Sequence, residues 1–270
     1  MEIVEQFVLG KSGDPHVCED SVVVTAEYAA VIDGATDVSG RCYGGAAGGW
    51  WAMRACRDAV QQLPHDVDPH RAVTAMTSEL AARLDSGLAA AERPSAAVTI
   101  YSQARREIWQ IGDVGFSYSG LPASVGQPRK RVDRVAASFR AAVLAAEAAA
   151  GTISMDRVVE ADPGRLAARA LTGRQGAVRN SIGPYGFAGI DGRPVPPSLA
   201  VVHPVPDRID ELIIASDGYP VIGETLAASE SKLALLLAKD PWCVAELAGT
   251  KGLLPGQVSF DDRAYLRIRL

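Results

Sequence analysis

Cysteine is scarce in this sequence, and the four that occur, Cys18, Cys42, Cys56 and Cys243, show no paired spacing. A disulfide framework and a zinc site both need cysteines at characteristic spacings, so neither is indicated. No apolar run approaches the roughly 20 residues that a membrane-spanning helix needs. The chain begins MEIVE, without the cationic region of a signal peptide. We therefore expect a protein of the reducing cytoplasm.

Positive charge is also limited. The sequence has 27 Lys and Arg against 32 Asp and Glu, a formal net charge of -5. That balance gives no bulk attraction to nucleic acid or to an anionic membrane, so we expect neither as a partner. With 48% apolar and 22% charged residues, the composition is that of an ordinary globular protein.

Strands and helices come in blocks rather than in strict alternation, which favours antiparallel sheets covered by helices. Apolar runs predict strands over residues 22–25, 29–32, 97–101, 107–111, 116–119, 199–203, 211–215 and 263–269. Helical periodicity and Asp-Pro caps predict helices over residues 50–63, 69–84, 132–150, 163–171, 231–238 and 241–248. The segment 172–197 is rich in glycine and proline and is expected to be a long loop, with at most a short strand over 185–188.

Two Asp-Gly pairs, each at the end of an apolar run, are the most informative feature. Asp33-Gly34 follows Ala30-Val31-Ile32, and Asp217-Gly218 follows the run that begins at Leu212. Each predicts a buried strand that carries a carboxylate at its end, followed by a sharp turn. A lone Asp-Gly is also a common turn signal. Further acidic pairs stand near both ends of the chain, and carboxylates gathered from distant segments suit hard divalent cations.

Five motifs, in this order, resemble the metal-dependent protein phosphatases of the 2C type. The pattern comprises an acidic pair, apolar-Asp-Gly, Gly-Asp, Ala-Ser-Asp-Gly and a final acidic pair before a strand. Here these are Glu19-Asp20, Asp33-Gly34, Gly112-Asp113, Ala215–Gly218 and Asp261-Asp262. The resemblance implies an α+β fold, a four-layer α-β-β-α sandwich of two antiparallel sheets flanked by helices. Because the motifs span almost the whole chain, we expect one domain over residues 1–270.

The resemblance also implies a site for two Mg²⁺ or Mn²⁺ ions, with water activated by the metals as the attacking group. Asp33 would bridge the ions, and the carbonyl of Gly34 would bind the second. Asp217 and Asp261 would bind the first, so these three aspartates are the catalytic candidates. Asp262 is an alternative ligand to Asp261, which could instead cap a turn.

Three further acidic residues have implied roles in metal binding. Glu19 would approach the second ion through water, and Asp20 would hold metal-bound waters. Asp113, with Asp217, matches a weaker third site in family members. Each of these motifs also has a structural alternative, because acidic residues at strand ends often form turns.

The sequence departs from the family where substrate would bind. Ala35 stands where some members have a histidine that is a candidate general acid. Pro15 stands where many have an arginine that holds the substrate phosphate, a charge-assisted contact. His16 and Lys11 are candidate substitutes, although a surface histidine and a solvated lysine are the alternatives.

Two arginines in the 172–197 segment, Arg174 and Arg179, are further candidates for contacting a substrate anion.

Three functions remain open from the sequence. The leading hypothesis is a serine/threonine protein phosphatase that acts on phosphorylated protein. The second keeps the chemistry but takes a small phosphorylated metabolite. In the third, the fold serves as a non-catalytic regulatory module.

Overall fold

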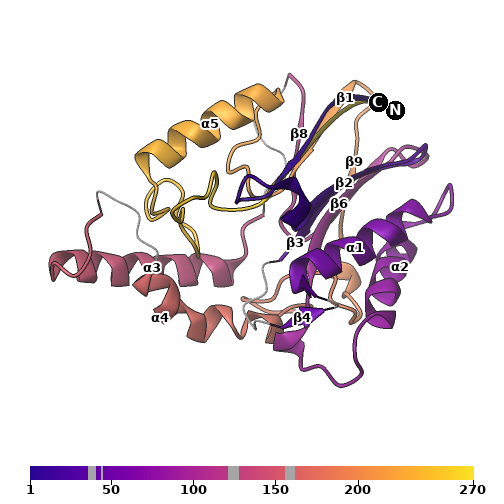
Figure 1. The fold of residues 1–270 in the computed structure, drawn as a ribbon. Coiled ribbons are helices and arrows are strands. Elements are labelled where there is room, and N and C mark those ends of the chain that lie inside the picture. The colour runs from indigo at the N-terminus through magenta and orange to yellow at the C-terminus, as the bar shows by residue number, and fades with distance from the viewer. Residues whose placement is uncertain (36–40, 44, 121–127, 156–161) are drawn as a thin grey trace.

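Two antiparallel sheets stand at the centre of the computed structural model, which describes residues 1–35, 41–43, 45–120, 128–155 and 162–270 (Figure 1). The first sheet has the strand order β1-β11-β10-β8, and the second has the order β2-β3-β6-β7-β9. The strands of the first sheet are β1 (Glu2–Leu9), β8 (Gly115–Tyr118), β10 (Glu211–Ala215) and β11 (Arg263–Arg269). Those of the second are β2 (Asp20–Val24), β3 (Tyr28–Gly34), β6 (Ala96–Ser102), β7 (Glu107–Ile111) and β9 (Val201–Pro204). A short ladder joins β4 (Cys42–Tyr43) to β5 (Ala46–Ala47).

The two sheets pack face to face through side chains of alternating strand positions. On β3, Ala29 and Val31 face the other sheet, where they share an apolar cluster with Leu212 and Ile214 of β10. The intervening β3 residues, such as Ile32, belong to a second cluster beneath the helices. Both faces of β3 are therefore buried, as its almost unbroken apolar run predicts.

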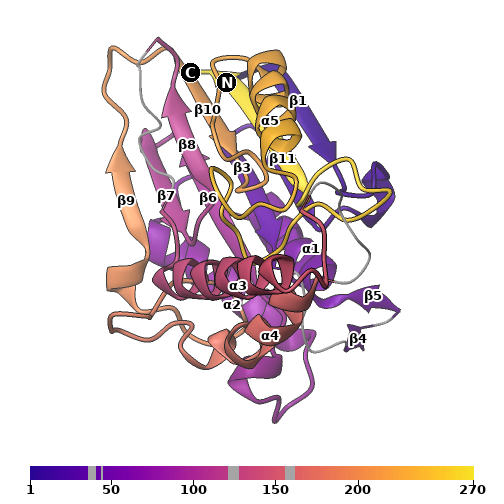
Figure 2. The same cartoon turned by 90° about the vertical axis from the view of Figure 1, so that its left-hand side faces the viewer.

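Helices cover the outer faces of both sheets. On the second sheet lie α1 (Gly48–Gln61) and α2 (Pro69–Ala82), and on the first lies α5 (Leu226–Lys239). The remaining pair, α3 (Arg131–Ala149) and α4 (Pro163–Thr172), pack against each other and lie together at one end of the sheets (Figure 2). The predicted α+β sandwich is confirmed, and α3 and α4 are placed where they can shape a site at that end. None of the helices in the described part of the chain is both long and apolar enough to cross a membrane.

Capping residues explain where several helices begin. Asp68 accepts a hydrogen bond from the backbone N–H of Arg71 at the start of α2. Asp162 does the same for the backbone N–H of Arg165 in α4. In both helices a proline follows the cap, so the Asp-Pro signals in the sequence mark real helix starts.

Three predictions of secondary structure were wrong. Residues 241–248 form turns rather than a helix, because the Asp240 carboxylate accepts hydrogen bonds from the backbone N–H groups of Val244, Ala245 and Leu247. Helix α5 begins five residues earlier than predicted, after the cap Thr225. Residues 185–188 contain only an isolated bridge, between Phe187 and Arg179.

The strand β1 was not predicted. It lies at the edge of its sheet, where it pairs with β11, and its residues are half-buried or exposed. Such a strand lacks the strong apolar run of a buried one.

Candidate functional site

The ends of several strands carry the predicted metal-binding residues to one place. Asp20 begins β2 and Asp33 lies near the end of β3, and the two are direct partners across the ladder. Asp113 follows β7, Asp217 follows β10, and Asp261 comes just before β11. These last three line one cavity of about 650 Å³ together with Asp33 and Gly34. Segments almost the whole chain apart therefore meet at this cavity.

Burial and mutual repulsion disfavour the charged forms of these carboxyl groups. The pKa of Asp33 is well above its ordinary value, first because the group is buried and then because Asp20 and Asp217 lie near. Burial, followed by Asp261 and Asp113, raises the pKa of Asp217 to about 7. The cluster thus carries more negative charge than its surroundings compensate, which is the electrostatic condition that a bound cation relieves.

Three lysines lie among the carboxylates. The Lys130 Nζ is 2.8 Å from Asp113 Oδ2, and the Lys251 Nζ is 2.5 Å from Asp261 Oδ1. Burial opposes the charge on Lys130, yet the carboxylates of Asp113, Asp133 and Asp217 raise its pKa above the ordinary value. These ammonium groups therefore offset part of the acidic charge.

Asp262 is held in a different way from Asp261. Its carboxylate accepts hydrogen bonds from the backbone N–H groups of Lys11, at 2.7 Å, and Glu19, at 3.2 Å. The Lys11 ammonium lies 3.1 Å from Asp262 Oδ2 and 3.5 Å from Glu19 Oε2. Asp262 thereby fastens the N-terminal segment to the start of β11, whereas Asp261 faces the cavity.

The glycine after Asp33 is required by close packing. The Gly34 N–H donates to the Glu19 carbonyl oxygen at 3.0 Å. A Cβ on Gly34 would lie 2.3 Å from the Gly49 carbonyl oxygen, and a Cβ on Gly49 would lie 2.6 Å from Glu19 Oε1. The start of α1, the end of β3 and Glu19 are therefore pressed together, at contacts that only glycine permits.

The chemistry of these donors fits a hard divalent cation, because every candidate ligand is an oxygen. Asp20 Oδ2 and Asp113 Oδ1 are also buried with no hydrogen-bond partner in the part of the chain that the structure describes. Within that same part, however, no group of three or more His, Cys, Asp or Glu residues is arranged to hold a metal ion. The oxygen donors are gathered in one region but do not form a closed cage.

The two candidate substitutes for the missing phosphate-binding arginine lie in different surroundings. His16 is exposed in a short turn after Asp14, and it is not among the residues that line the cavity. Lys11 is only 24% exposed and is ion-paired with Glu19 and Asp262. The alternative of a solvated lysine is therefore wrong for Lys11.

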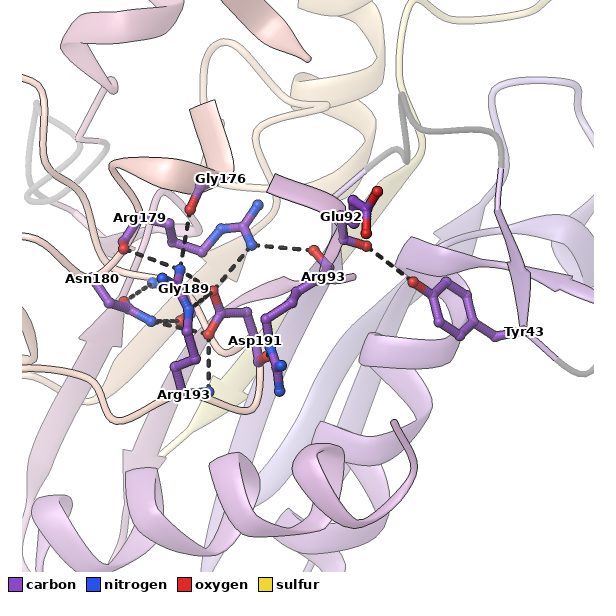
Figure 3. Close-up of polar contacts among 9 residues, drawn as sticks. All are labelled: Tyr43, Glu92, Arg93, Gly176, Arg179, Asn180, Gly189, Asp191 and Arg193. Carbon is purple, nitrogen blue, oxygen red and sulfur yellow. Dashed lines mark hydrogen bonds and ion pairs between the residues drawn. The ribbon is translucent and has the colours of Figure 1, made fainter. Parts of the chain in front are cut away.

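The two arginines of the 172–197 segment do not have free guanidinium groups facing the cavity. Arg174 is exposed and donates to the Ala170 carbonyl oxygen of the preceding helix at 3.0 Å. Arg179 lines the cavity, but it is buried, and its Nη1 is 3.2 Å from both Asp191 Oδ2 and the Arg93 carbonyl oxygen (Figure 3).

Asp191 is the centre of the polar network that contains Arg179. It is fully buried and accepts hydrogen bonds from Arg179, Asn180 and Arg193, the last at 2.6 Å (Figure 3). The network ties the loop after α4 to the segment around Arg93. This arrangement indicates a structural role for Arg179.

Sequence reasoning missed four basic residues that line the cavity, namely Lys130, Arg165, Arg169 and Lys251. Lys130 stands in the basic run Arg129–Arg131, which by its charge alone indicates a solvated helix entrance. Only the position of α3 shows that this lysine points toward Asp113. The sequence did not indicate that the arginines of α4 line a cavity, because a basic residue on a helix is ordinarily solvated.

No protein-family model and no curated protein sequence matches the chain. Solved structures do match it. Serine/threonine phosphatase Stp1 from Staphylococcus aureus is 11% identical, with 100% of this chain and 96% of that chain covered at a TM-score of 0.50. RsbX in complex with magnesium is 14% identical, with 98% of this chain and 93% of that chain covered at a TM-score of 0.47. The catalytic domain of serine threonine protein phosphatase PstP in complex with two manganese ions is 15% identical. The match covers 94% of this chain and 92% of that chain at a TM-score of 0.42.

The similarity to Stp1 extends over the whole of this chain. The chain therefore has the fold of the bacterial 2C-type serine/threonine phosphatases, and the resemblance drawn from the five motifs is confirmed at the level of the fold.

Proposed function

We propose that this protein is a metal-dependent hydrolase of phosphate monoesters. The observation that carries the proposal is the charge at the end of the sheets. Eight carboxylates lie there with three lysine ammonium groups, so negative charge is in excess when all are ionised, and bound divalent cations would reduce that excess. The carboxylates are Glu19, Asp20, Asp33, Asp113, Asp133, Asp217, Asp261 and Asp262, and the lysines are Lys11, Lys130 and Lys251.

Each candidate ligand has a role in this proposal. Asp33 would hold both Mg²⁺ or Mn²⁺ ions, and the Gly34 carbonyl would hold the second of them. Asp217 and Asp261 would hold the first. Two such ions would lower the pKa of a bound water and neutralise phosphoryl oxygens, which is the chemistry that phosphate ester hydrolysis needs.

Other residues in the cluster orient these ligands. Asp20 is the cross-strand partner of Asp33, and its Oδ2 is free to hold a water in the site. Glu19 lies beside Gly34 and Gly49, so it belongs to the same region. Lys130 stays protonated beside Asp113 and adds positive charge where a phosphoryl group would lie.

A second candidate function is a regulatory module without catalysis. It is favoured by one observation, that lysines already pair with Asp113, Asp261 and Glu19, three of the candidate ligands. If those ion pairs replace the metal ions permanently, the fold would be retained while the chemistry is lost.

Calorimetry with Mn²⁺ separates the two candidates, and hydrolysis of p-nitrophenyl phosphate with Mn²⁺ or with EDTA completes the test. We expect the protein to bind Mn²⁺ and to release phosphate only when the metal is present. The variant Asp33→Asn should lose both properties. Asp207→Asn, which removes a fully exposed carboxylate, is the matched control and should keep them.

The two functions give opposite results. Absence of Mn²⁺ binding at millimolar metal would refute the hydrolase and support the regulatory module. Binding of Mn²⁺ without any hydrolysis of p-nitrophenyl phosphate or a phosphopeptide would also count against catalysis. Activity that survives EDTA or Asp33→Asn would contradict the assigned metal chemistry.

A further inference from the structure

The cavity also has a wall formed by residues that do not belong to the strand ends. Helix α4 supplies it, through residues from Pro163 to Thr172, and Phe187 to Gly189 continue it. The acidic residues and α4 therefore face the same space. A ligand whose phosphate lies near Asp33 and Asp217 would have the rest of its structure against α4.

Two arginines give this wall positive charge. Arg165 and Arg169 are one helical turn apart, so they share a face of α4, and both line the cavity. Arg165 is half-buried, and its guanidinium has no ion pair or hydrogen bond to any other residue in the described part of the chain. A half-buried guanidinium at a cavity wall is well suited to bind a carboxylate or a phosphate.

The wall is held in a fixed position. The Asp162 carboxylate caps α4 through the backbone N–H of Arg165 at 2.7 Å and accepts a hydrogen bond from Arg140 Nε at 2.8 Å. A Cβ on Gly164 would lie 2.5 Å from the Arg140 carbonyl oxygen, so α4 approaches α3 very closely. Because α4 cannot shift easily, its arginines are preorganised for a ligand.

The size of the cavity limits the ligand. Its volume of about 650 Å³ lies within the range of pockets for small molecules, roughly 300–1,000 Å³. Leu166 and Phe187 add apolar surface to the wall that carries the arginines. A compact ester with an anionic group at each end matches this arrangement better than an extended phosphopeptide, whose flanking residues would have to pass α4.

We propose that the cavity selects small phosphate esters that carry a second anionic group, and that Arg165, with Arg169 beside it, binds that group. The proposal rests on the hydrolase function proposed above. Arg165 is thus a specificity-determining residue in the part of the wall that α4 forms.

A pair of nearly isosteric esters tests the proposal. 3-Phosphoglycerate has a carboxylate where glycerol 3-phosphate has a neutral hydroxymethyl group. With Mn²⁺ we expect kcat/KM for 3-phosphoglycerate to be about 10- to 100-fold higher, as for one charge-assisted contact. Arg165→Gln should remove this preference, because it lowers kcat/KM for 3-phosphoglycerate far more than kcat/KM for glycerol 3-phosphate. Arg174→Gln, at an exposed arginine that donates to the Ala170 carbonyl oxygen of the preceding helix, is the control and should retain the preference.

Binding supplies a readout that does not depend on turnover. Calorimetry should show 3-phosphoglycerate binding to the wild-type protein and binding at least tenfold weaker to Arg165→Gln. Arg165→Lys should restore part of the difference, because the positive charge returns without the bidentate geometry. Circular dichroism of each variant confirms that it is folded.

The outcomes distinguish this proposal from the hydrolase function. Hydrolysis of p-nitrophenyl phosphate together with equal kcat/KM for the two esters overturns the second anionic site and leaves the hydrolase in place. A higher kcat/KM for a phosphoserine peptide than for 3-phosphoglycerate also overturns it. If no ester is hydrolysed, the hydrolase fails, and the calorimetric comparison of wild type with Arg165→Gln alone decides for or against the anion site.

Discussion

Replacing Arg140 with methionine should destabilise the protein more than any change on the exposed face of the same helix. Arg140 is fully buried in α3. Its guanidinium is 2.7 Å from Asp162 Oδ2 and also donates to the carbonyl oxygens of Trp242, Cys243 and Gly249, at 2.7, 3.1 and 3.1 Å. One side chain therefore joins α3, the start of α4 and the segment that leads to Lys251.

The expected magnitude follows from the groups left behind. Removing one partner of a buried ion pair costs about 3–5 kcal/mol, because the other charge remains buried. Asp162 keeps its hydrogen bond from the Arg165 N–H, which lowers the cost, while three carbonyl oxygens lose a charged donor, which raises it. We expect a loss of about 4 kcal/mol in the free energy of unfolding.

Equilibrium unfolding in urea measures this loss. Arg134→Met, at an exposed arginine of the same helix, is the matched control and should change stability by less than about 0.5 kcal/mol. Combining Arg140→Met with Asp162→Asn should cost less than the sum of the single changes, because the buried charge is then removed as well. A loss below about 1 kcal/mol for Arg140→Met would refute the reasoning.

Two further changes test the acidic end of the sheets. The pKa of Asp217 is raised from 3.8 to about 7, so the folded chain holds a proton there between about pH 4 and 7 that the unfolded chain has released. Without metal, the free energy of unfolding should fall as pH rises through that range, by at most about 4 kcal/mol for this group. Urea midpoints at pH 5 and pH 8 measure it, and a higher midpoint at pH 8 contradicts the assignment. Gly34→Ala, which places a Cβ 2.3 Å from the Gly49 carbonyl oxygen, should cost about 2 kcal/mol. Gly183→Ala has open space around its Cβ and should be neutral, and equal melting temperatures for both variants would show that the contact at Gly34 is easily relieved.

The sequence predicted the sheets well because buried strands are encoded locally, and the acidic residues at their ends remain a prediction of the metal site. A buried strand has an apolar run, and Asp33 and Asp217 each stand at or just past the end of one. Once two sheets with antiparallel strands are inferred, the ends of those strands are expected to meet. The edge strand β1 was not predicted, because prediction depended on apolar runs and the exposed side chains of β1 interrupt that pattern.

The partners of the acidic residues could not be predicted, because they depend on distances between segments far apart in the chain. Strand β8 and the residues after it separate Asp113 from Lys130, and nothing in their spacing indicates an ion pair. Arg179 was expected to face a substrate. Its actual partner, Asp191, stands in a loop whose sequence shows no regular pattern, and only the folded structure brings the two together.

The position of α3 and α4 determines which basic residues lie near the buried carboxylates at the strand ends. Apolar packing holds the two sheets together, but the ends of their strands carry buried carboxylates that repel one another. Helix α3 begins beside Lys130, α4 presents Arg165, and Arg140 fastens both helices to the segment before Lys251. The basic residues near the carboxylates therefore belong to segments that contact one another, namely α3, α4 and the segment before Lys251. The same contacts that stabilise these segments fix the distance between the acidic wall and the basic wall, and so they set the size of the anion that the cavity can accept.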